Sequence, residues 1–155
     1  MLMFGAGFAA DGPAEAWARR RGWHAGIEFR GHVPHAEIID LLSHQVDALV
    51  HPSFVEAHPM PLIEAMSLGI PVIGGRGSGG VPWTLGNGAY GILVDVHSPE
   101  EMVSAMLKLA QDPQYRAKLG QAGRESAERR FHLDDVVDRY EGIYMELASR
   151  GSRKR

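Results

Sequence analysis

Two glutamates, Glu56 and Glu64, stand eight positions apart in a stretch that is rich in proline and histidine. A pair of carboxylates at a binding site can accept hydrogen bonds from vicinal hydroxyl groups, such as those of a ribose. The backbone N–H groups between them could add donors for a phosphate, except at Pro59 and Pro61, which have none. Two acids at any given spacing are common, so on the pair alone the better interpretation is structural, with Glu64 a first-turn residue of a helix and Glu56 a solvated loop charge.

The residues around the glutamates predict a strand, a loop and a helix. Residues 46–50 are apolar except for Asp47, and we interpret them as a parallel strand buried on both faces. Residues 62–68 are predicted to be helical and to end at Gly69, since glycine accepts the left-handed conformation that follows many helices. Glu56 then falls on the loop at the carboxyl end of the strand, where open α/β sheets bind ligands. Glu64 is expected in the opening turn of the helix, where the helix dipole favours negative charge.

Strands and helices alternate along most of the chain. The pattern predicts strands at residues 2–4, 27–30, 46–50, 70–73 and 90–94, helices at 14–21, 36–44 and 62–68, and three C-terminal helices that start near Ser98, Asp112 and Asp134. Ser98 and Glu101 have the spacing of a capping box. The fold class is therefore α/β, with a doubly wound, mostly parallel sheet and C-terminal helices. Residues 1–149 are expected to form one domain, and residues 150–155 a basic, disordered tail.

Composition excludes several classes of function. The net charge is −3 and the sequence pI is about 6.2, which is unlike a general nucleic-acid-binding protein. The chain has no cysteine, so disulfides, thiolate metal sites and cysteine nucleophiles are ruled out. No apolar run is long enough to span a membrane, and the apolar start is too short for a signal peptide. A cytoplasmic location is the resulting expectation.

Beyond these patterns, residues 46–94 resemble the donor-binding half of the family-4 glycosyltransferases, which have the GT-B fold. The matching segments occur in order and at the family's spacings: Asp47-Ala-Leu-Val-His-Pro-Ser53, Glu56-x7-Glu64-Ala-Met, Gly69-Ile-Pro-Val-Ile73, Gly79-Gly-Val-Pro82 and Gly91-Ile-Leu-Val-Asp95. Weaker resemblance extends from about Leu2 to about Leu147. It implies that the sheet is the Rossmann-like half of a GT-B enzyme.

The resemblance also implies roles for individual residues. Glu56 would contact the donor sugar and Glu64 the ribose of a nucleoside diphosphate sugar, and the turn that ends at Val33 would touch the base. The backbone around residues 57–60 would face the sugar and the phosphates, which gives the donor-binding set Glu56, Ala57, His58, Pro59, Met60, Glu64 and Val33. The implied reaction is hexosyl transfer to a hydroxyl group with retention, without a metal ion or a cofactor.

The sequence departs from the family pattern in two respects. His58-Pro59 stands where many members have Phe-Gly, which removes one backbone donor. These residues contain no counterpart of three features of the family: the strand with a glycine-rich turn, the diphosphate-binding Arg and Lys, and the N-terminal acceptor domain. Arg76 is a remote candidate for the diphosphate-binding role and is better interpreted as a loop charge. We therefore expect the chain to be inactive alone. Because the absent strand is the central one of the sheet, we also expect self-association through a sheet edge or a repaired sheet.

Two other functions remain open on the sequence. The first is a non-catalytic nucleotide-binding or interaction module that keeps the same fold. The second is a related sugar-nucleotide epimerase, which the spacing of Glu56 and Glu64 disfavours. The chain has eight histidines, including His32, His35 and His51, but their positions are typical of turns and surfaces, so no metal site is predicted.

Overall fold

The computed structural model describes residues 1–152 of the chain, with side chains through residue 150. The chain divides into two compact units, the first covering Met1–His44 and the second beginning at Gln45. Both units contain parallel strands followed by helices, so the α/β class with parallel sheets and C-terminal helices is confirmed. The prediction of a single domain over residues 1–149 stays a prediction.

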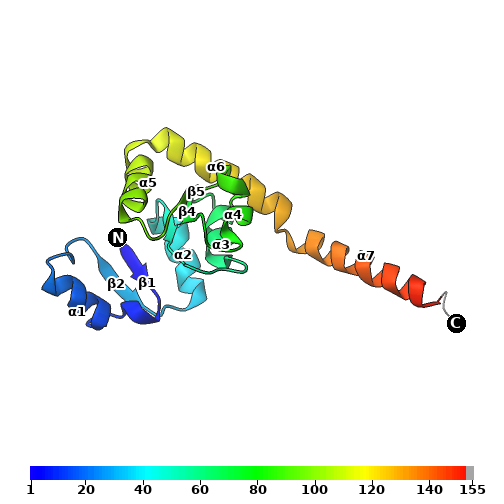
Figure 1. Ribbon diagram of the computed structural model, residues 1–155, viewed down its shortest axis with the longest axis horizontal. Coiled ribbons are helices and arrows are strands. Elements are labelled where there is room, and N and C mark those ends of the chain that lie inside the picture. Colours follow the sequence, from blue (N-terminus) through cyan, green and yellow to red (C-terminus); the bar gives the residue numbers. More distant parts are fainter. Residues whose placement is uncertain (153–155) are drawn as a thin grey trace. The chain divides into compact units, whose positions relative to one another are not determined.

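The first unit is built on two parallel strands, β1 (Leu2–Phe4) and β2 (Glu28–Gly31), which lie side by side in Figure 1. A short 3-10 turn, η1 (Ala6–Phe8), and the helix α1 (Pro13–Arg20) connect them. Pro13 occupies the first turn of α1, as predicted, because its missing N–H is not needed there. The helix α2 (His35–Gln45) follows β2.

One buried carboxylate organises the turn before α1. Glu15 accepts a hydrogen bond from the backbone N–H of Asp11 at 2.8 Å and pairs with Arg19. The Asp11 N–H, and after it Arg19, lower the pKa of the Glu15 carboxyl. Asp11 itself has a positive φ of 57°, which is uncommon for a residue with a side chain. The Glu15 carboxylate therefore stabilises a strained turn as well as the start of the helix.

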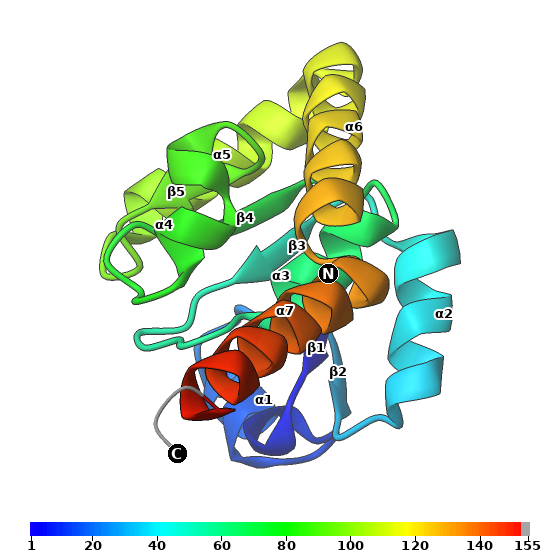
Figure 2. The ribbon, with the colours of Figure 1, turned by 90° about the vertical axis from the view of Figure 1, so that its right-hand side faces the viewer.

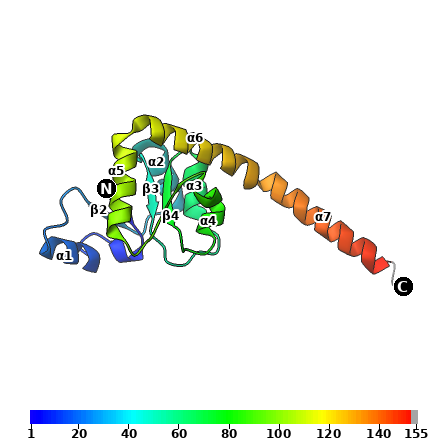
Figure 3. The same ribbon diagram turned by 45° about the horizontal axis from the view of Figure 1, so that its top comes forward.

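The second unit is built on three parallel strands in the order β3 (Leu49–His51), β4 (Val72–Gly75) and β5 (Ile92–Val94). The helix α5 (Pro99–Gln111) covers one face of this sheet, and α3 (Met60–Ser67) and α4 (Val81–Thr84) cover the other (Figure 3). The helix α6 (Pro113–Arg130) lies along α3 (Figure 2). Buried side chains of β4, β5, α5 and α6 form a core: Ile73, Val94, Ala105, Leu109 and Leu119. The sequence pattern did not predict α4 or the 3-10 turn η2 (Gly86–Gly88).

Within the described residues, the five strands form two sheets rather than one continuous sheet. β1 pairs only with β2, and β3 pairs only with β4. The prediction that residues 46–50 form a strand buried on both faces was wrong in two respects. The strand is Leu49–His51, and each of its residues is only partly buried. The physical reason is its place at the edge of the sheet, where one side has no strand to cover it.

The helix α7 (Leu133–Ser152) follows α6, and its side chains through residue 150 are exposed. Of the predicted basic tail, Arg150 is helical and pairs with Glu146 at 2.5 Å, and α7 includes the next two residues. Residues 153–155, the rest of that tail, lie outside the described residues. Among the helices that the structure describes, none combines the length and the apolar character needed to cross a membrane.

Candidate functional site

The loop between β3 and α3, residues 52–59, carries most of the predicted site and is here called the motif loop. Backbone contacts tie it to the glycine-rich loop, residues 76–80, that follows β4. The carbonyl oxygen of Ser53 accepts a hydrogen bond from the Ser78 hydroxyl at 2.5 Å. The carbonyl oxygen of Glu56 accepts one from the Gly80 N–H at 2.7 Å. The motif loop is therefore held through its main chain at two separate points.

Two glycines allow the two loops to come this close. A Cβ atom at Gly79 would lie 2.2 Å from the Glu56 carbonyl oxygen, and one at Gly80 would lie 2.2 Å from that of Ala57. Real Cβ atoms essentially never approach another heavy atom within 3.0 Å. Gly79 also has a positive φ of 54°, which glycine adopts without strain. Glycine is therefore required at both positions by the contact with the motif loop.

The Glu56 carboxylate is partly buried, and a contact with a histidine side chain holds it in one orientation. Its Oε1 lies 2.7 Å from Nε2 of His51, the last residue of β3, and the two side chains are 23% and 22% exposed, respectively. Glu56 thus lies at the carboxyl edge of the sheet, as predicted from the strand–loop–helix pattern. The contact with His51 was not predicted, although a histidine at the strand end and an acid five residues later could have suggested it.

Glu64 is not in the opening turn of its helix, which corrects the sequence prediction. The helix α3 begins at Met60 rather than Leu62, so Glu64 is its fifth residue. The earlier start follows from the prolines: Pro59 precedes the helix and Pro61 lies in its first turn, where a missing N–H costs nothing. The helix dipole acts mainly on the first turn, so it favours the Glu64 charge less than expected.

The backbone donors of the motif loop are fewer than the number of residues suggests. Pro59 and Pro61 have no N–H, and the Met60 N–H donates to the His58 carbonyl at 2.9 Å. Between residues 57 and 61, this leaves the N–H groups of Ala57 and His58 without a partner among the described residues. Within residues 57–61, these two groups, rather than the helix terminus, are the donors that the loop could offer to an anionic ligand.

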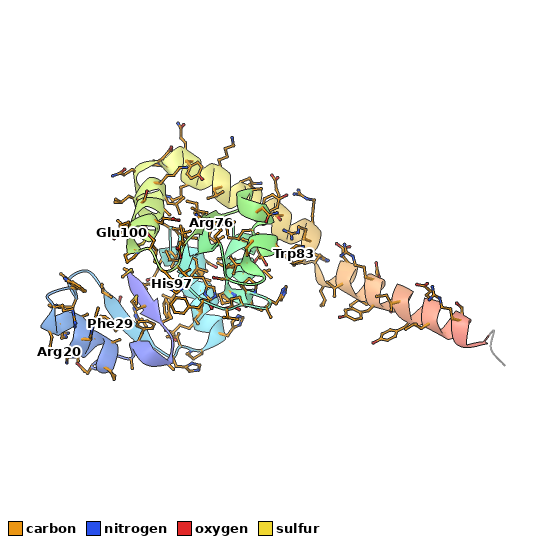
Figure 4. The ribbon with its side chains drawn as sticks, in the orientation of Figure 1. Arg20, Phe29, Arg76, Trp83, His97 and Glu100 are labelled. Carbon is orange, nitrogen blue, oxygen red and sulfur yellow. The ribbon has the colours of Figure 1, made fainter. Side chains whose placement is uncertain are left out.

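The His58 ring is part of an aromatic cluster at the end of α6. It meets the Phe131 ring edge-on at 5.9 Å between centroids, and Phe131 meets Trp83 in the same way at 5.7 Å. The Arg130 guanidinium lies 4.5 Å from the Trp83 ring centroid and donates to the carbonyl oxygens of Trp83 and Thr84 at 2.8 and 3.0 Å. Trp83, labelled in Figure 4, comes from α4, so this cluster connects the motif loop to α4 and α6.

Arg76, also labelled in Figure 4, is engaged with the β5–α5 segment. Its guanidinium donates to the Leu93 carbonyl at 3.2 Å and to the Glu101 carboxylate at 2.9 Å. Glu101 also accepts the Asp95 N–H, and this hydrogen bond, followed by that from Arg76, lowers the pKa of the Glu101 carboxyl. Half of the predicted capping box is present: the Ser98 hydroxyl accepts the Glu101 N–H at 3.2 Å, but the Ser98 N–H donates to the Asp95 carbonyl and not to Glu101. These contacts favour the interpretation of Arg76 as a loop charge.

The remaining predicted residue, Val33, belongs to the first unit. Its side chain is 8% exposed, so a ligand at this turn would meet backbone atoms rather than the isopropyl group. In the part of the chain that the structure describes, no three His, Asp or Glu side chains gather as a metal ion would require. The individual ligand contacts assigned to Glu56, Glu64 and their neighbours stay predictions.

Comparisons with known proteins identify the family and the fold of the chain. Residues 5–126 match the family described as Glycosyl transferases group 1. The D-inositol 3-phosphate glycosyltransferase of Streptomyces bingchenggensis is 33% identical over 150 residues, which are 97% of this chain and 32% of that protein. Sucrose-phosphate synthase from Thermosynechococcus elongatus superposes with a TM-score of 0.80 at 24% identity, over 96% of this chain and 38% of its own. HepE from Anabaena, solved in complex with UDP-glucose, gives a TM-score of 0.75 at 25% identity, over 96% of this chain and 40% of its own. The chain therefore spans about a third of the length of such relatives.

Proposed function

Because the chain belongs to the group 1 glycosyltransferases, we propose that it is the donor-binding domain of a retaining enzyme that transfers a hexose from a nucleoside diphosphate sugar to a hydroxyl group. The observation that carries the proposal is the motif loop, which presents a directed carboxylate and two backbone donors at the carboxyl edge of β3. Hydroxyl groups of a sugar and oxygens of a diphosphate are the ligand groups that match such a surface.

In this proposal each group of the motif has one task. Glu56 accepts hydrogen bonds from hydroxyl groups of the donor sugar, and Glu64 accepts them from the ribose. The N–H groups of Ala57 and His58 point a positive dipole at the sugar or the diphosphate, with the exposed Met60 side chain beside them, whereas the Pro59 side chain is buried and offers the ligand only backbone atoms. The chemistry needs stabilisation of the leaving diphosphate, which fixed backbone dipoles supply without reorganisation. No metal ion or cofactor takes part.

The proposal includes partners for the whole reaction. The relatives are about two and a half to three times as long as this chain, which supports an acceptor-binding half that is supplied by further residues or by another polypeptide. HepE, one of those relatives, was solved with UDP-glucose, which supports a nucleotide sugar as the ligand. We expect the 155-residue chain to bind donor without transferring its sugar, in the cytoplasm.

A second part of the proposal concerns self-association. β3 pairs with β4 alone and leaves its other side without a strand among the described residues. Such an edge can accept a strand from another copy of the chain. We expect a concentration-dependent dimer or larger species in sedimentation experiments, and a compact monomer at all concentrations would rule this part out.

Titration with nucleotides tests the function directly. UDP, GDP and ADP, each with and without a hexose, should be added to the chain while heat release or thermal stability is measured. At least one series should bind at or below millimolar concentration, and failure of all of them would leave the non-catalytic interaction module as the better reading. For the ligand that binds, Glu64→Ala should remove a charge-assisted hydrogen bond to the ribose and cost about tenfold or more in affinity. Unchanged affinity would refute the ribose role.

A further inference from the structure

The contact between His51 and Glu56 joins a rigid element to a loop. His51 is the last residue of β3, and its register partner is Gly74 of β4. Glu56 lies on the motif loop, where only its main chain is held by the glycine-rich loop. The 2.7 Å contact between Nε2 and Oε1 is therefore the one interaction that fixes the Glu56 side chain among the described residues.

The chemistry of the pair determines which atoms remain for a ligand. An ionised carboxylate only accepts hydrogen bonds, so Nε2 of His51 carries the hydrogen that it shares with Oε1. Both the neutral imidazole with hydrogen on Nε2 and the imidazolium satisfy this condition. The second oxygen, Oε2, has no partner among the described residues. One carboxylate oxygen is thus occupied by the protein, and the other is left to accept a hydroxyl hydrogen.

Burial makes this arrangement more than a surface ion pair. The His51 and Glu56 side chains are 22% and 23% exposed, whereas Asp40 and His44, a comparable pair on α2, are 68% and 69% exposed. Exposed pairs of this kind hold geometry weakly because water competes with both partners. A pair that is mostly shielded restricts the carboxylate to one orientation, which lowers the entropy that ligand binding must remove.

We propose that His51 is a positioning residue that holds the Glu56 carboxylate in the orientation needed by the donor sugar. This rests on the proposed role of Glu56 in binding that sugar. His51 itself does not touch the ligand in this arrangement; it acts through Glu56. Its effect should therefore appear in binding of the sugar portion and not in binding of the nucleoside diphosphate.

Binding experiments on the 155-residue chain test this assignment. UDP-glucose and UDP are the first pair of probes, followed by GDP-mannose with GDP and ADP-glucose with ADP. With the pair that binds, His51→Ala should weaken the nucleotide sugar about three- to tenfold and the bare diphosphate less than about twofold. His51→Gln, whose amide N–H can donate in place of Nε2, should recover most of the loss. His44→Ala, in the exposed pair, serves as the control and should change neither affinity.

A double-mutant cycle separates positioning from a general structural effect. In the Glu56→Ala background, His51→Ala should have no further effect on the nucleotide sugar, because the group that it positions is gone. Additive losses, or an equal loss for the sugar nucleotide and the bare diphosphate, would overturn the proposal. The same holds if His51→Gln is as weak as His51→Ala while both unfold at the wild-type temperature.

A ligand-free measurement keeps the assignment independent of the proposed function. The imidazole ¹⁵N resonances of His51, identified by their loss in His51→Gln, should place a hydrogen on Nε2 and should shift in Glu56→Ala. If the His51 resonances have the same chemical shifts in Glu56→Ala as in the wild type, the positioning contact is refuted. If no nucleotide or nucleotide sugar binds the wild-type chain but the resonances behave as expected, the proposed function fails while the contact stands.

Discussion

Replacing Gly80 with alanine should disrupt the motif loop, whereas replacing Gly77 with alanine should not. Gly80 has φ −74° and ψ −9°, a conformation open to any residue, so the effect of a methyl group there is steric. A Cβ at Gly80 would lie 2.2 Å from the Ala57 carbonyl oxygen, and a Cβ at Gly77 would meet no atom within 4 Å. Both changes restrict the unfolded chain equally, so their difference isolates the contact between the two loops.

The structure gives the size of the displacement. A Cβ atom at 2.2 Å must move out to at least 3.0 Å, so the two loops must separate by about 0.8 Å. The hydrogen bond from the Gly80 N–H to the Glu56 carbonyl, now 2.7 Å long, would then stretch to about 3.5 Å and be lost. Overpacking together with one lost hydrogen bond costs about 1–3 kcal/mol in the free energy of unfolding.

Two assays follow this change. Thermal unfolding should show a decrease in Tm of about 3–10 °C for Gly80→Ala and little change for Gly77→Ala. Donor affinity should fall about tenfold or more in Gly80→Ala, because the motif loop is displaced by nearly 1 Å from the ligand. If the two variants have the same Tm and the same affinity, the close approach of the loops does not position the site and the reasoning is wrong.

Three further predictions concern other parts of the second unit. The pKa of Glu101 is held below its ordinary value in the folded chain, so its carboxylate adds stability above the unfolded pKa, and this stability is lost as the pH falls through the folded pKa. In Glu101→Gln, the urea midpoint of unfolding should therefore decrease less steeply than in the wild type as the pH is lowered from about 5. The same steepness in both proteins would contradict this. Arg130→Lys keeps the charge but not the planar fork over Trp83, so it should still lower the free energy of unfolding by about 1–2 kcal/mol in urea titrations; wild-type stability would argue against the fork. The Leu49 N–H donates to Pro71 next to β4, so the Val50 N–H, one residue on, faces the free side of β3. Val50→Pro removes this donor and should weaken any dimer seen in sedimentation, and an unaffected dimer would place the interface elsewhere.

Local patterns carried most of what the sequence could predict. The cap at Ser98 and Glu101, the proline at the start of α1 and the strand–loop–helix around Glu56 depend on residues within a few positions of one another. The interactions that form these features lie within the segment itself, so the local sequence was sufficient to predict them. The predicted start of α3 was wrong by two residues because proline is common in loops but is also well suited to the first turn of a helix, where Pro61 lies.

Contacts between distant segments were not predictable in the same way. Arg130 reaches the carbonyls of Trp83 and Thr84 across more than forty residues, and no property of the arginine in its own helix indicates that. The exposure of β3 depends on which strands lie beside it, which the apolar run at 46–50 does not encode. The requirement for Gly79 and Gly80 likewise follows from the path of the motif loop, so only the folded chain reveals it.

The motif loop is anchored by the carbonyl oxygens of Ser53 and Glu56, which every residue type possesses. Side chains at exposed loop positions such as Val55 and Ala57 can therefore be exchanged without loosening the two main-chain attachments. A lineage that carries this loop can vary the surface facing its ligand while it inherits an unchanged backbone path. The two glycines opposite the loop are the positions that such diversification must leave alone, and a library that randomises residues 55 and 57 with Gly79 and Gly80 fixed should retain folded members at high frequency.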